Sequence, residues 1–346
     1  MFKKFISFIS FLFILLISAC IPGRLIPVAP TTSPAATGTA SATLTPFMPL
    51  LPSPTLSPTA AASTPTARPT TTAIPRSVPD FSHVIVFVLE NHEIGFVIGS
   101  PLMPSYNRWA GQFTLLTQYY AITHPSLPNY LALIGGDTFG ITSDCETCYI
   151  NQSSLPDLLE ASGRTWRTYQ EDLPKPCFVG STLAYAQKHD PFIYFDPIRT
   201  NPARCQAGIV PLTQLEGDLS SGKLPDFVFI MPNLCNSGHD CSLDVSDAWL
   251  KTWVGKVMAS PAYDSHTLIV LTWDEGQGSH GCCGIVPGGG QVATMLISPL
   301  VRQGFKDPTP YTHYALLKTI AEAWGLPALR HAADPTQALI EAPFQH

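Results

Sequence analysis

The residue in this sequence best suited to nucleophilic chemistry is a serine at the start of a predicted helix. Ser126 follows the strand-like run 113–120 and opens the apolar segment 127–134. Serine is favoured at the N-cap, and Pro128 is tolerated in the first helical turn because its missing N–H is not needed there. We therefore expect the Ser126 hydroxyl beside free backbone N–H groups at the positive end of a helix dipole, where phosphate binds well. A capping serine without catalytic duty is the alternative.

Carboxylate and amide side chains follow the most hydrophobic runs of the chain. Runs 83–89, 227–231 and 267–273 are continuous apolar segments of the buried-strand type. Polar residues just past the ends of parallel strands lie in the crevice where ligands bind. Their oxygen atoms suit Ca²⁺, Mg²⁺ or Mn²⁺ and are acceptable to Zn²⁺, although each acidic pair taken alone is more often a helix cap. The residues are Glu90, Asn91, Asn233, Asp274 and Glu275.

Buried strands alternate with helices along the rest of the chain, and this alternation predicts an α/β fold with a largely parallel central sheet. The region from residue 79 to 346 has the length of one large domain, and we find no internal repeat. The expected strands are 83–89, 113–120, 164–170 (polar, at an edge of the sheet), 227–231, 267–273 and 292–298. Besides the helix at Ser126, the expected helices are 104–112, 247–258 and 312–324.

Residues 1–19 have the pattern of an export signal. Lys3 and Lys4 precede an apolar run of about thirteen residues, which is short for a membrane span. The segment 17–20, Ile-Ser-Ala-Cys, resembles the lipobox of bacterial lipoproteins, which implies cleavage before Cys20 and acylation of its thiol. We expect a protein anchored by lipid at the outer face of the bacterial cell membrane. An ordinary signal peptide and a secreted protein are the alternative.

Residues 20–78 are rich in Pro, Thr, Ser and Ala and nearly free of charge. Such a composition cannot bury enough apolar surface to fold, so we expect a disordered tether. The formal net charge of the chain is -6, which argues against nucleic acid as a partner. We expect a monomer.

Five pieces of the chain together resemble the bacterial phosphoesterase family of acid phosphatases and phospholipases C, within the alkaline-phosphatase-like superfamily. They occur in the family's order and span most of residues 80–300. The resemblance implies a three-layer α/β sandwich around the parallel sheet. The matching pieces are 90–92 (Glu-Asn-His), 124–130 (His-Pro-Ser-Leu-Pro-Asn-Tyr), 188–192 (Lys-His-Asp-Pro-Phe), Pro232-Asn233 with His239-Asp240, and 274–276 (Asp-Glu-Gly).

The resemblance also implies roles for individual residues. Ser126 would be a metal-bound nucleophile. From the chemistry of a hydroxyl beside a cation we expect in-line attack and a phosphoserine intermediate, with His239 or His189 protonating the leaving group. The implied metal ligands are Glu90, Asn91, Ser126, Asp274 and Glu275. The implied phosphate-site residues are Lys188, His189 and His239, and further candidates for substrate contact are His124, Asn129 and His280. Asn129 could equally stabilise its own turn.

The expected activity is hydrolysis of small-molecule or lipid phosphate esters. Phospholipase C relatives carry an Asp-His-Val element downstream of their Asp-Glu pair, and this chain has a different sequence at 278–283. Monoesters are therefore favoured over phosphodiesters and phospholipid head groups. A sulfatase would need arginine where Tyr130 stands, and a serine α/β-hydrolase would show G-x-S-x-G, which is absent from the sequence. A non-catalytic surface-binding lipoprotein is the remaining alternative.

Nine cysteines are present, and the eight beyond Cys20 form an even set, as expected for disulfides in an exported protein. Eight thiols allow on the order of a hundred pairings. A structural zinc site is disfavoured because only one C-x-x-C spacing occurs and no matching histidines accompany it. Proximity in the sequence favours the pairs Cys145–Cys148, Cys177–Cys205 and Cys235–Cys241, with Cys282–Cys283 as a vicinal bridge.

Overall fold

The structure is a computed structural model that describes residues 76–345. The predicted export signal, Cys20 and nearly all of the predicted tether lie outside the described residues. Among the helices that are described, none combines the length and the apolar character needed to cross a bilayer.

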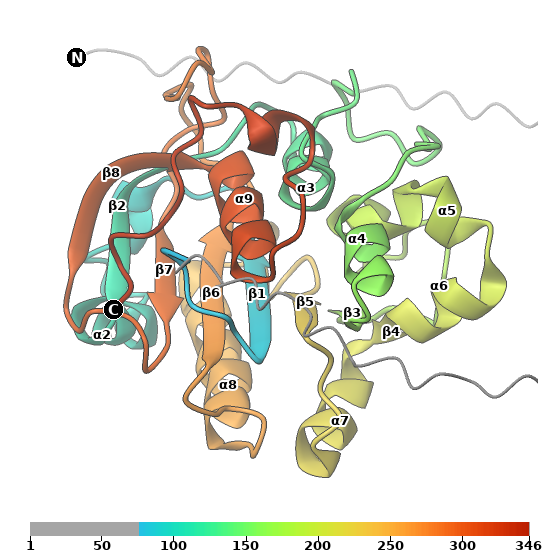
Figure 1. The fold of residues 1–346 in the computed structure, drawn as a ribbon, viewed down its shortest axis with the longest axis horizontal. Helices are drawn as coiled ribbons and strands as arrows, with labels where there is room; N and C mark the ends of the chain where they lie inside the picture. Colours follow the sequence, from blue (N-terminus) through green and yellow to red (C-terminus); the bar gives the residue numbers. More distant parts are fainter. Residues whose placement is uncertain (1–75, 346) are drawn as a thin grey trace, which may run out of the picture. The chain divides into compact units, whose positions relative to one another are not determined.

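An eight-stranded sheet forms the centre of the described region, with the strand order β4-β3-β5-β1-β6-β7-β2-β8 (Figure 1). All neighbouring strands pair in parallel except β7, which runs antiparallel to both β6 and β2. The carboxyl ends of the other seven strands therefore meet at one edge. The strands are β1 (His83–Leu89), β2 (Thr114–Tyr120), β3 (Trp166–Gln170), β4 (Ile209–Pro211), β5 (Phe227–Met231), β6 (Thr267–Trp273), β7 (Thr294–Ile297) and β8 (Lys306–Thr312).

Helices surround this sheet (Figure 1), and α3 packs against α9 while α2 packs against α8. The α-helices are α1 (Ile94–Val97), α2 (Pro104–Gln112), α3 (Ser126–Gly135), α4 (Leu155–Ala161), α5 (Asp196–Arg199), α6 (Pro202–Gly208), α7 (Leu215–Ser221), α8 (Leu243–Ala259) and α9 (His313–Ala323). Short 3₁₀ helices are η1 (Gln187–His189), η2 (Pro191–Tyr194), η3 (Leu212–Gln214) and η4 (Arg330–Ala333).

The centre of the sheet is almost fully buried and largely apolar, which explains why its strands could be predicted from the sequence. Every residue of β5 and β6 is buried, and only the first residue of β1 is partly exposed. Strands covered on both faces need this continuous apolar pattern rather than alternation. The prediction of an α/β fold with a largely parallel central sheet is confirmed.

Several elements differ from the prediction. The polar run 164–170 was expected at an edge, yet β3 lies between β4 and β5, because the three-residue strand β4 takes the edge position. The run 292–298 becomes β7, the one antiparallel strand. Helix α8 begins at Leu243 instead of Asp247. The outer strand β8 was not predicted, because its two prolines are unusual in a strand and are tolerated only at an edge.

Candidate active site

The first acidic residues of the site follow two strands that lie side by side. Strands β1 and β6 pair up to Leu89 and Trp273, so Glu90 and Asp274 leave the sheet at the same level. The backbone N–H of Asp274 donates to the carbonyl of Leu89 at 2.9 Å. Asn91 adopts a left-handed conformation with φ 62°, which asparagine tolerates better than most residues. This turn directs the Asn91 N–H to Oδ1 of Asp274 at 3.0 Å.

Ser126 is the first residue of α3, and the N-cap is Pro125. The prediction that Ser126 caps the helix is therefore wrong. Its hydroxyl is not bonded to the helix and instead faces two carboxylates, with Oγ 3.2 Å from Oε2 of Glu90 and 3.5 Å from Oε1 of Glu275. One of the helix N–H groups expected to be free is also occupied, since Leu127 donates to Oδ1 of Asp144 at 2.9 Å.

A lysine completes the surroundings of the serine hydroxyl. Nζ of Lys188, on η1, lies 3.4 Å from Oγ of Ser126 and 3.0 Å from Oδ2 of Asp144. Asp144 thus bridges the lysine and the start of α3. The ammonium group is placed where it would stabilise negative charge on the serine oxygen or on a phosphoryl group beside it.

Glu90 is fully buried and has two further partners. The hydroxyl of Tyr130, one turn along α3 from Ser126, donates to Oε1 at 2.5 Å. Nε2 of His189 lies 2.8 Å from the same oxygen, an ion-pair distance without hydrogen-bond alignment. Burial alone would raise the pKa of Glu90, but the neighbouring His189 and Lys188 charges together with hydrogen bonds outweigh it and lower the pKa to about 2. Glu90 is therefore an anion at neutral pH.

Glu275 is held by two residues that were predicted to contact substrate. Nδ1 of His124 lies 2.9 Å from Oε2 of Glu275, and Nε2 lies 2.8 Å from the carbonyl of Gly278. Both ring nitrogens of His124 are therefore occupied by contacts within the protein. Burial raises the pKa of Glu275 to about 7, against the opposing charge of His124. The geometry thus favours orientation of Glu275, rather than substrate contact, as the role of His124.

Asn129 is likewise occupied within the protein. Its Oδ1 accepts the N–H groups of Ile122 and Thr123 at 2.9 and 3.1 Å, while Nδ2 donates to the Thr123 carbonyl at 2.8 Å and to Oε2 of Glu275 at 3.3 Å. The side chain is completely buried. The alternative reading of Asn129 as a turn-stabilising residue therefore fits the structure better than a contact with substrate.

The acidic cluster has the donor chemistry of a site for a hard cation. Oδ2 of Asp274 is buried and has no hydrogen-bond partner. Burial, together with the charges of Glu90 and Glu275, holds the pKa of Asp274 well above its usual range. A bound divalent cation would supply the missing partner and offset the repulsion between the carboxylates. No group of three or more His, Cys, Asp or Glu side chains in residues 76–345 already lies in position to enclose a metal ion. The cluster therefore fits a divalent cation in two respects: its side chains offer oxygen donors, and one buried oxygen of Asp274 has no hydrogen-bond partner.

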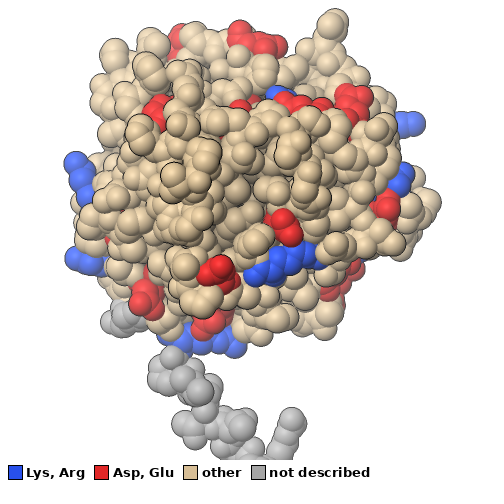
Figure 2. All heavy atoms as spheres, turned by 90° about the horizontal axis from the view of Figure 1, so that it is seen from above, with Lys and Arg blue, Asp and Glu red and all other residues tan. Residues whose placement is uncertain are grey.

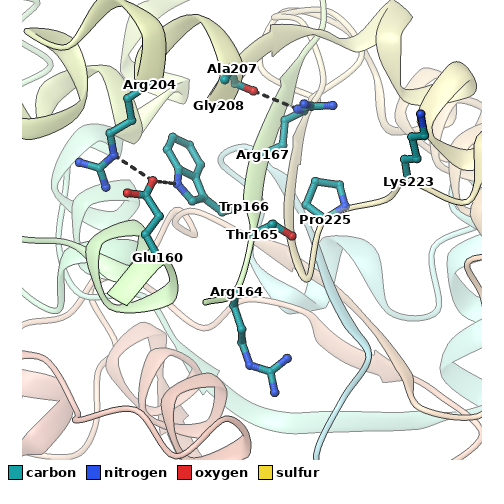
Figure 3. A pocket seen from close by; sticks show the side chains of 10 residues that line it. All are labelled: Glu160, Arg164, Thr165, Trp166, Arg167, Arg204, Ala207, Gly208, Lys223 and Pro225. Atoms are coloured by element: carbon teal, nitrogen blue, oxygen red, sulfur yellow. Dashed lines mark hydrogen bonds and ion pairs between the residues drawn. The ribbon is translucent and has the colours of Figure 1, made fainter. Parts of the chain in front are cut away.

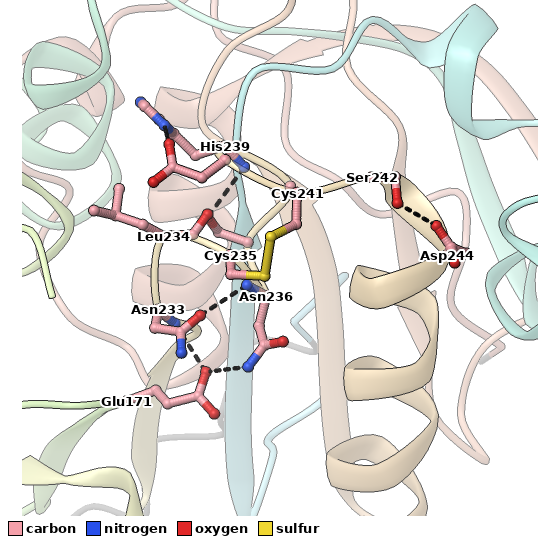
Figure 4. The surroundings of a disulfide bond; sticks show 12 residues. Glu171, Asn233, Leu234, Cys235, Asn236, His239, Cys241, Ser242 and Asp244 are labelled. Atoms are coloured by element: carbon pink, nitrogen blue, oxygen red, sulfur yellow. Dashed lines mark hydrogen bonds and ion pairs between the residues drawn. A yellow bond between two sulfur atoms is a disulfide. The ribbon is translucent and has the colours of Figure 1, made fainter. Parts of the chain in front are cut away.

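His239 lies close to the cluster, whereas Asn233 does not join it. The ring of His239 is 6.2 Å from that of His189, and its Nδ1 is 2.6 Å from Oδ1 of Asp240. Asn233 instead binds Glu171 through its backbone N–H at 2.9 Å and accepts the N–H of Asn236 at 2.8 Å (Figure 4). The prediction that Asn233 contributes to a shared site is not supported by these contacts.

Disulfides brace the loops around the site. The structure has bridges at Cys145–Cys148, Cys177–Cys205, Cys235–Cys241 and Cys282–Cys283. The third closes the loop that carries His239 (Figure 4), and the fourth lies in the loop that follows Glu275. His280 belongs to that last loop, where it is exposed and takes no part in the hydrogen bonds among the described site residues. The structure thus gives no support to a substrate contact by His280.

Three residues of this network were not predicted to act in the site. Tyr130 was given no role of its own within the matching piece 124–130, yet its hydroxyl binds Glu90. Asp144 lies in an irregular loop without a helix or strand signal. His313 is completely buried, with Nε2 2.6 Å from the carbonyl of Asp274, and burial lowers its pKa to about 4. Only Tyr130, one helical turn after Ser126, had a spacing that could have pointed to the site.

Asp190 provides a test of the turn that carries Lys188 and His189. It is buried between η1 and η2, and burial raises its pKa to about 8, far above the value near 4 of an unfolded chain. The folded state therefore holds the proton more tightly, so this contribution to stability is complete below about pH 4 and is lost as the pH rises through about 8. We expect Asp190→Asn to flatten the pH dependence of the free energy of unfolding, measured by urea denaturation between about pH 5 and 8. An unchanged slope, equal to that of the exposed control Asp172→Asn, would contradict this.

A separate cavity lies near the start of β3, at the opposite end of that strand from the site residues (Figure 3). Its volume is about 340 Å³. Its arginines are neutralised by nearby carboxylates. The ion pairs are Arg164 with Asp80 and Asp226, Arg167 with Asp218, and Arg204 with Asp157 and Glu160. Lys223, which also lines the cavity, is exposed and forms none of these ion pairs, so the cavity keeps one cationic side chain in contact with solvent.

Solved structures, one of them from the alkaline phosphatase superfamily, share the fold of this chain. A protein in the alkaline phosphatase superfamily from Vibrio parahaemolyticus is 16% identical, with a TM-score of 0.52 over 75% of this chain and 72% of that one. The lipoteichoic acid synthase LtaP from Listeria monocytogenes is 10% identical, with a TM-score of 0.54 over 78% and 77% of the two chains. At these identities the likeness shows the fold alone, and it confirms the predicted architecture.

Sequence comparisons give the family. A phosphatidylinositol-3-phosphatase from Mycobacterium tuberculosis is 35% identical over 265 residues, which cover 75% of this chain and 82% of that protein. An acid phosphatase from Aspergillus fumigatus is also 35% identical, over 64% of this chain and 51% of the relative, so the chain spans about half of that protein's length. The model of the phosphoesterase family matches residues 100–327. The chain belongs to the phosphoesterase family.

Proposed function

We propose that this chain hydrolyses phosphate esters, with monoesters preferred, through a phosphoserine intermediate on Ser126. The observation that carries the proposal is the placement of the buried Ser126 hydroxyl at a helix start, between the carboxylates of Glu90 and Glu275 and the ammonium group of Lys188. Charged neighbours of this kind can activate a hydroxyl as a nucleophile and stabilise the charge that develops on it, which a serine with a purely structural role would not need. Membership of the phosphoesterase family supports the same chemistry.

The chain's own residues account for much of the mechanism. Oγ of Ser126 attacks phosphorus in line with the leaving oxygen and passes its proton to the facing Oε1 of Glu275, which returns the proton when the phosphoserine is hydrolysed. Lys188 stabilises the negative charge that develops on the phosphoryl oxygens. His239 is partly exposed and is oriented by Asp240, so it can donate a proton to the departing alkoxide. Water then hydrolyses the phosphoserine, and His239 accepts a proton from it in that second step.

The predicted ligands Glu90, Asn91, Asp274 and Glu275 would hold a divalent cation beside Ser126. Such a cation lowers the pKa of a hydroxyl that it binds and neutralises phosphoryl charge. The role of the four residues would be to supply the oxygen donors to that cation. The unpartnered oxygen of Asp274 supports this assignment.

Amphiphilic phosphate esters are a second candidate substrate class, favoured by the exposed apolar side chains around the site. All five large apolar side chains that are exposed in residues 76–345 lie in the connections after β1, β3 and β6, which also supply Glu90, Lys188 and Glu275. They are Phe96, Leu102, Val179, Leu183 and Val286. Figure 2, a view from above the molecule as drawn in Figure 1, shows a face with few Lys or Arg side chains and broad uncharged areas. An acylated Cys20 would keep the chain at a lipid surface.

One assay tests the proposed function. We expect the purified protein to hydrolyse p-nitrophenyl phosphate faster than bis(p-nitrophenyl) phosphate, to lose activity in EDTA, and to regain it when a divalent cation is restored. Dioctanoyl phosphatidate, assayed below and above its micelle-forming concentration, tests the amphiphilic class by a rise in rate at the transition. Activity that resists every chelator would exclude the metal. Absence of turnover on all three substrates with each of Ca²⁺, Mg²⁺, Mn²⁺ and Zn²⁺ would leave the non-catalytic alternative.

A further inference from the structure

Glu93, which no step of the mechanism uses, holds the loop 276–291 through its carboxylate. Oε2 accepts the backbone N–H groups of Gln277 and Gly278 at 3.0 and 3.1 Å, and Oε1 accepts that of Gln291 at 2.9 Å. Three bonds to one ionised group are stronger than three between neutral groups. Most of this loop has no helix or strand of its own, and Glu93 adds three bonds to the backbone bonds that cross the loop, such as those from Gly276 to Gly289 and from Gly290 to His280.

The loop is built closely around this carboxylate. A Cβ atom on Gly276 would lie 2.1 Å from Oε2 of Glu93, and one on Gly290 would lie 2.7 Å from the same atom. Gly290 also has φ +91°, a conformation that side chains with a Cβ rarely adopt. The two glycines therefore let both ends of the loop approach the carboxylate.

The two segments joined by this contact are both adjacent in the sequence to residues of the site. Glu93 is three residues after Glu90, and the loop begins immediately after Glu275. Gly278 contacts both Glu93 and His124: its N–H donates to Glu93, and its carbonyl lies next to Nε2 of His124. The other ring nitrogen of His124, Nδ1, contacts Oε2 of Glu275. The connection after β1 and the connection after β6 are thus tied together on either side of Ser126.

We infer that Glu93 is a positioning residue that sets the placement of Glu275 relative to Glu90 around the Ser126 hydroxyl. This role rests on the proposed function, and it assigns Glu93 no contact with substrate or metal. Misplacement of a reacting group by about 1 Å costs roughly a hundredfold in rate, so a side chain remote from the chemistry can control turnover. A purely structural Glu93 would instead affect the melting temperature and leave turnover unchanged at temperatures well below melting.

The test compares the wild type, Glu93→Gln and the control Glu160→Gln. Glu160 is bonded by Nε1 of Trp166 at 2.6 Å and by Nε of Arg204 at 2.9 Å, in the cavity near the start of β3. For Glu93→Gln we expect kcat on p-nitrophenyl phosphate to fall by roughly tenfold to a hundredfold, with KM within about threefold of the wild type. Hydrogen–deuterium exchange should accelerate in residues 276–291 and stay unchanged in β1 and β5. The control should lower the melting temperature and keep kcat within about twofold.

Two results would overturn the inference: faster exchange in the loop with an unchanged kcat, or unchanged exchange. If Glu93→Gln does not fold, Gly276→Ala perturbs the same contact from the loop side and should give the same pair of effects. A wild type without phosphatase activity would remove the proposed function. The exchange comparison would then still decide whether Glu93 orders the loop.

Discussion

Replacing Ser126 with alanine is expected to lower kcat for p-nitrophenyl phosphate by roughly 10³-fold or more. The hydroxyl is the proposed nucleophile. Neither Oε2 of Glu90 at 3.2 Å nor Nζ of Lys188 at 3.4 Å is suited to replace it, because the first belongs to an anion paired with His189 and the second to a cation. Steady-state kinetics measure the loss. Mass spectrometry of acid-quenched protein should show one added phosphoryl group on the wild type and none on the variant.

The control for this prediction is Ser220→Ala on α7, an exposed serine whose hydroxyl binds only the carbonyl of Gly217. It should keep wild-type kinetics. Both variants should show cooperative thermal unfolding, because the Ser126 side chain is small and its loss leaves little space. If Ser126→Ala retained activity within about tenfold of the wild type, the nucleophile would have to be another group.

Replacing Glu90 with glutamine should have the second largest effect, on both activity and stability. The carboxylate contacts Ser126, Tyr130 and His189 in a fully buried position, so its neutral substitute leaves the buried His189 without its counter-charge. Breaking one partner of a buried pair costs on the order of 3 kcal/mol. We expect kcat to fall by roughly 10²-fold or more, because the oxygen facing Oγ loses its charge.

Urea denaturation and steady-state kinetics on the same preparations check this result. The exposed Glu341→Gln is the matched control and should leave both quantities unchanged. Since the pKa of Glu90 is lowered to about 2, its stabilising contribution should be present at neutral pH and lost only as the pH falls toward that value. A Glu90→Gln protein as active as the wild type would remove Glu90 from the site.

The sequence was most informative for elements whose structure is determined by a single physical requirement, such as complete burial. Strands β1, β5 and β6 could be located within the chain because complete burial requires an unbroken apolar run. The meeting of Glu90 with Asp274 followed from the parallel sense of two such strands. Strand β3 was misplaced because position within a sheet depends on what pairs outside it, here the three-residue β4, which has no recognisable pattern of its own.

The residues that were missed act through contacts between distant segments. Asp144 reaches the site through an irregular loop, and Glu93 acts on backbone N–H groups more than 180 residues away. Backbone groups are present at every residue, so no side-chain pattern in the sequence marks such a partner. The sequence left the role of Asn129 open, and it did not indicate the contact of His124 with Glu275, for a related reason. A polar side chain next to a nucleophile can face the substrate or the protein, and only the three-dimensional arrangement of acceptors shows which.

The single direction of seven strands has a consequence for altering the enzyme by directed evolution. The groups assigned to the chemistry lie in connections beyond the carboxyl ends of strands or at the first turn of α3, and none lies inside a strand. Libraries confined to the connections after β1, β3 and β6 would therefore vary the surroundings of the leaving group while the sheet that supports them keeps its packing. The exposed positions Phe96, Leu183 and Val286 offer entry points at which diversity should carry little penalty in folding yield.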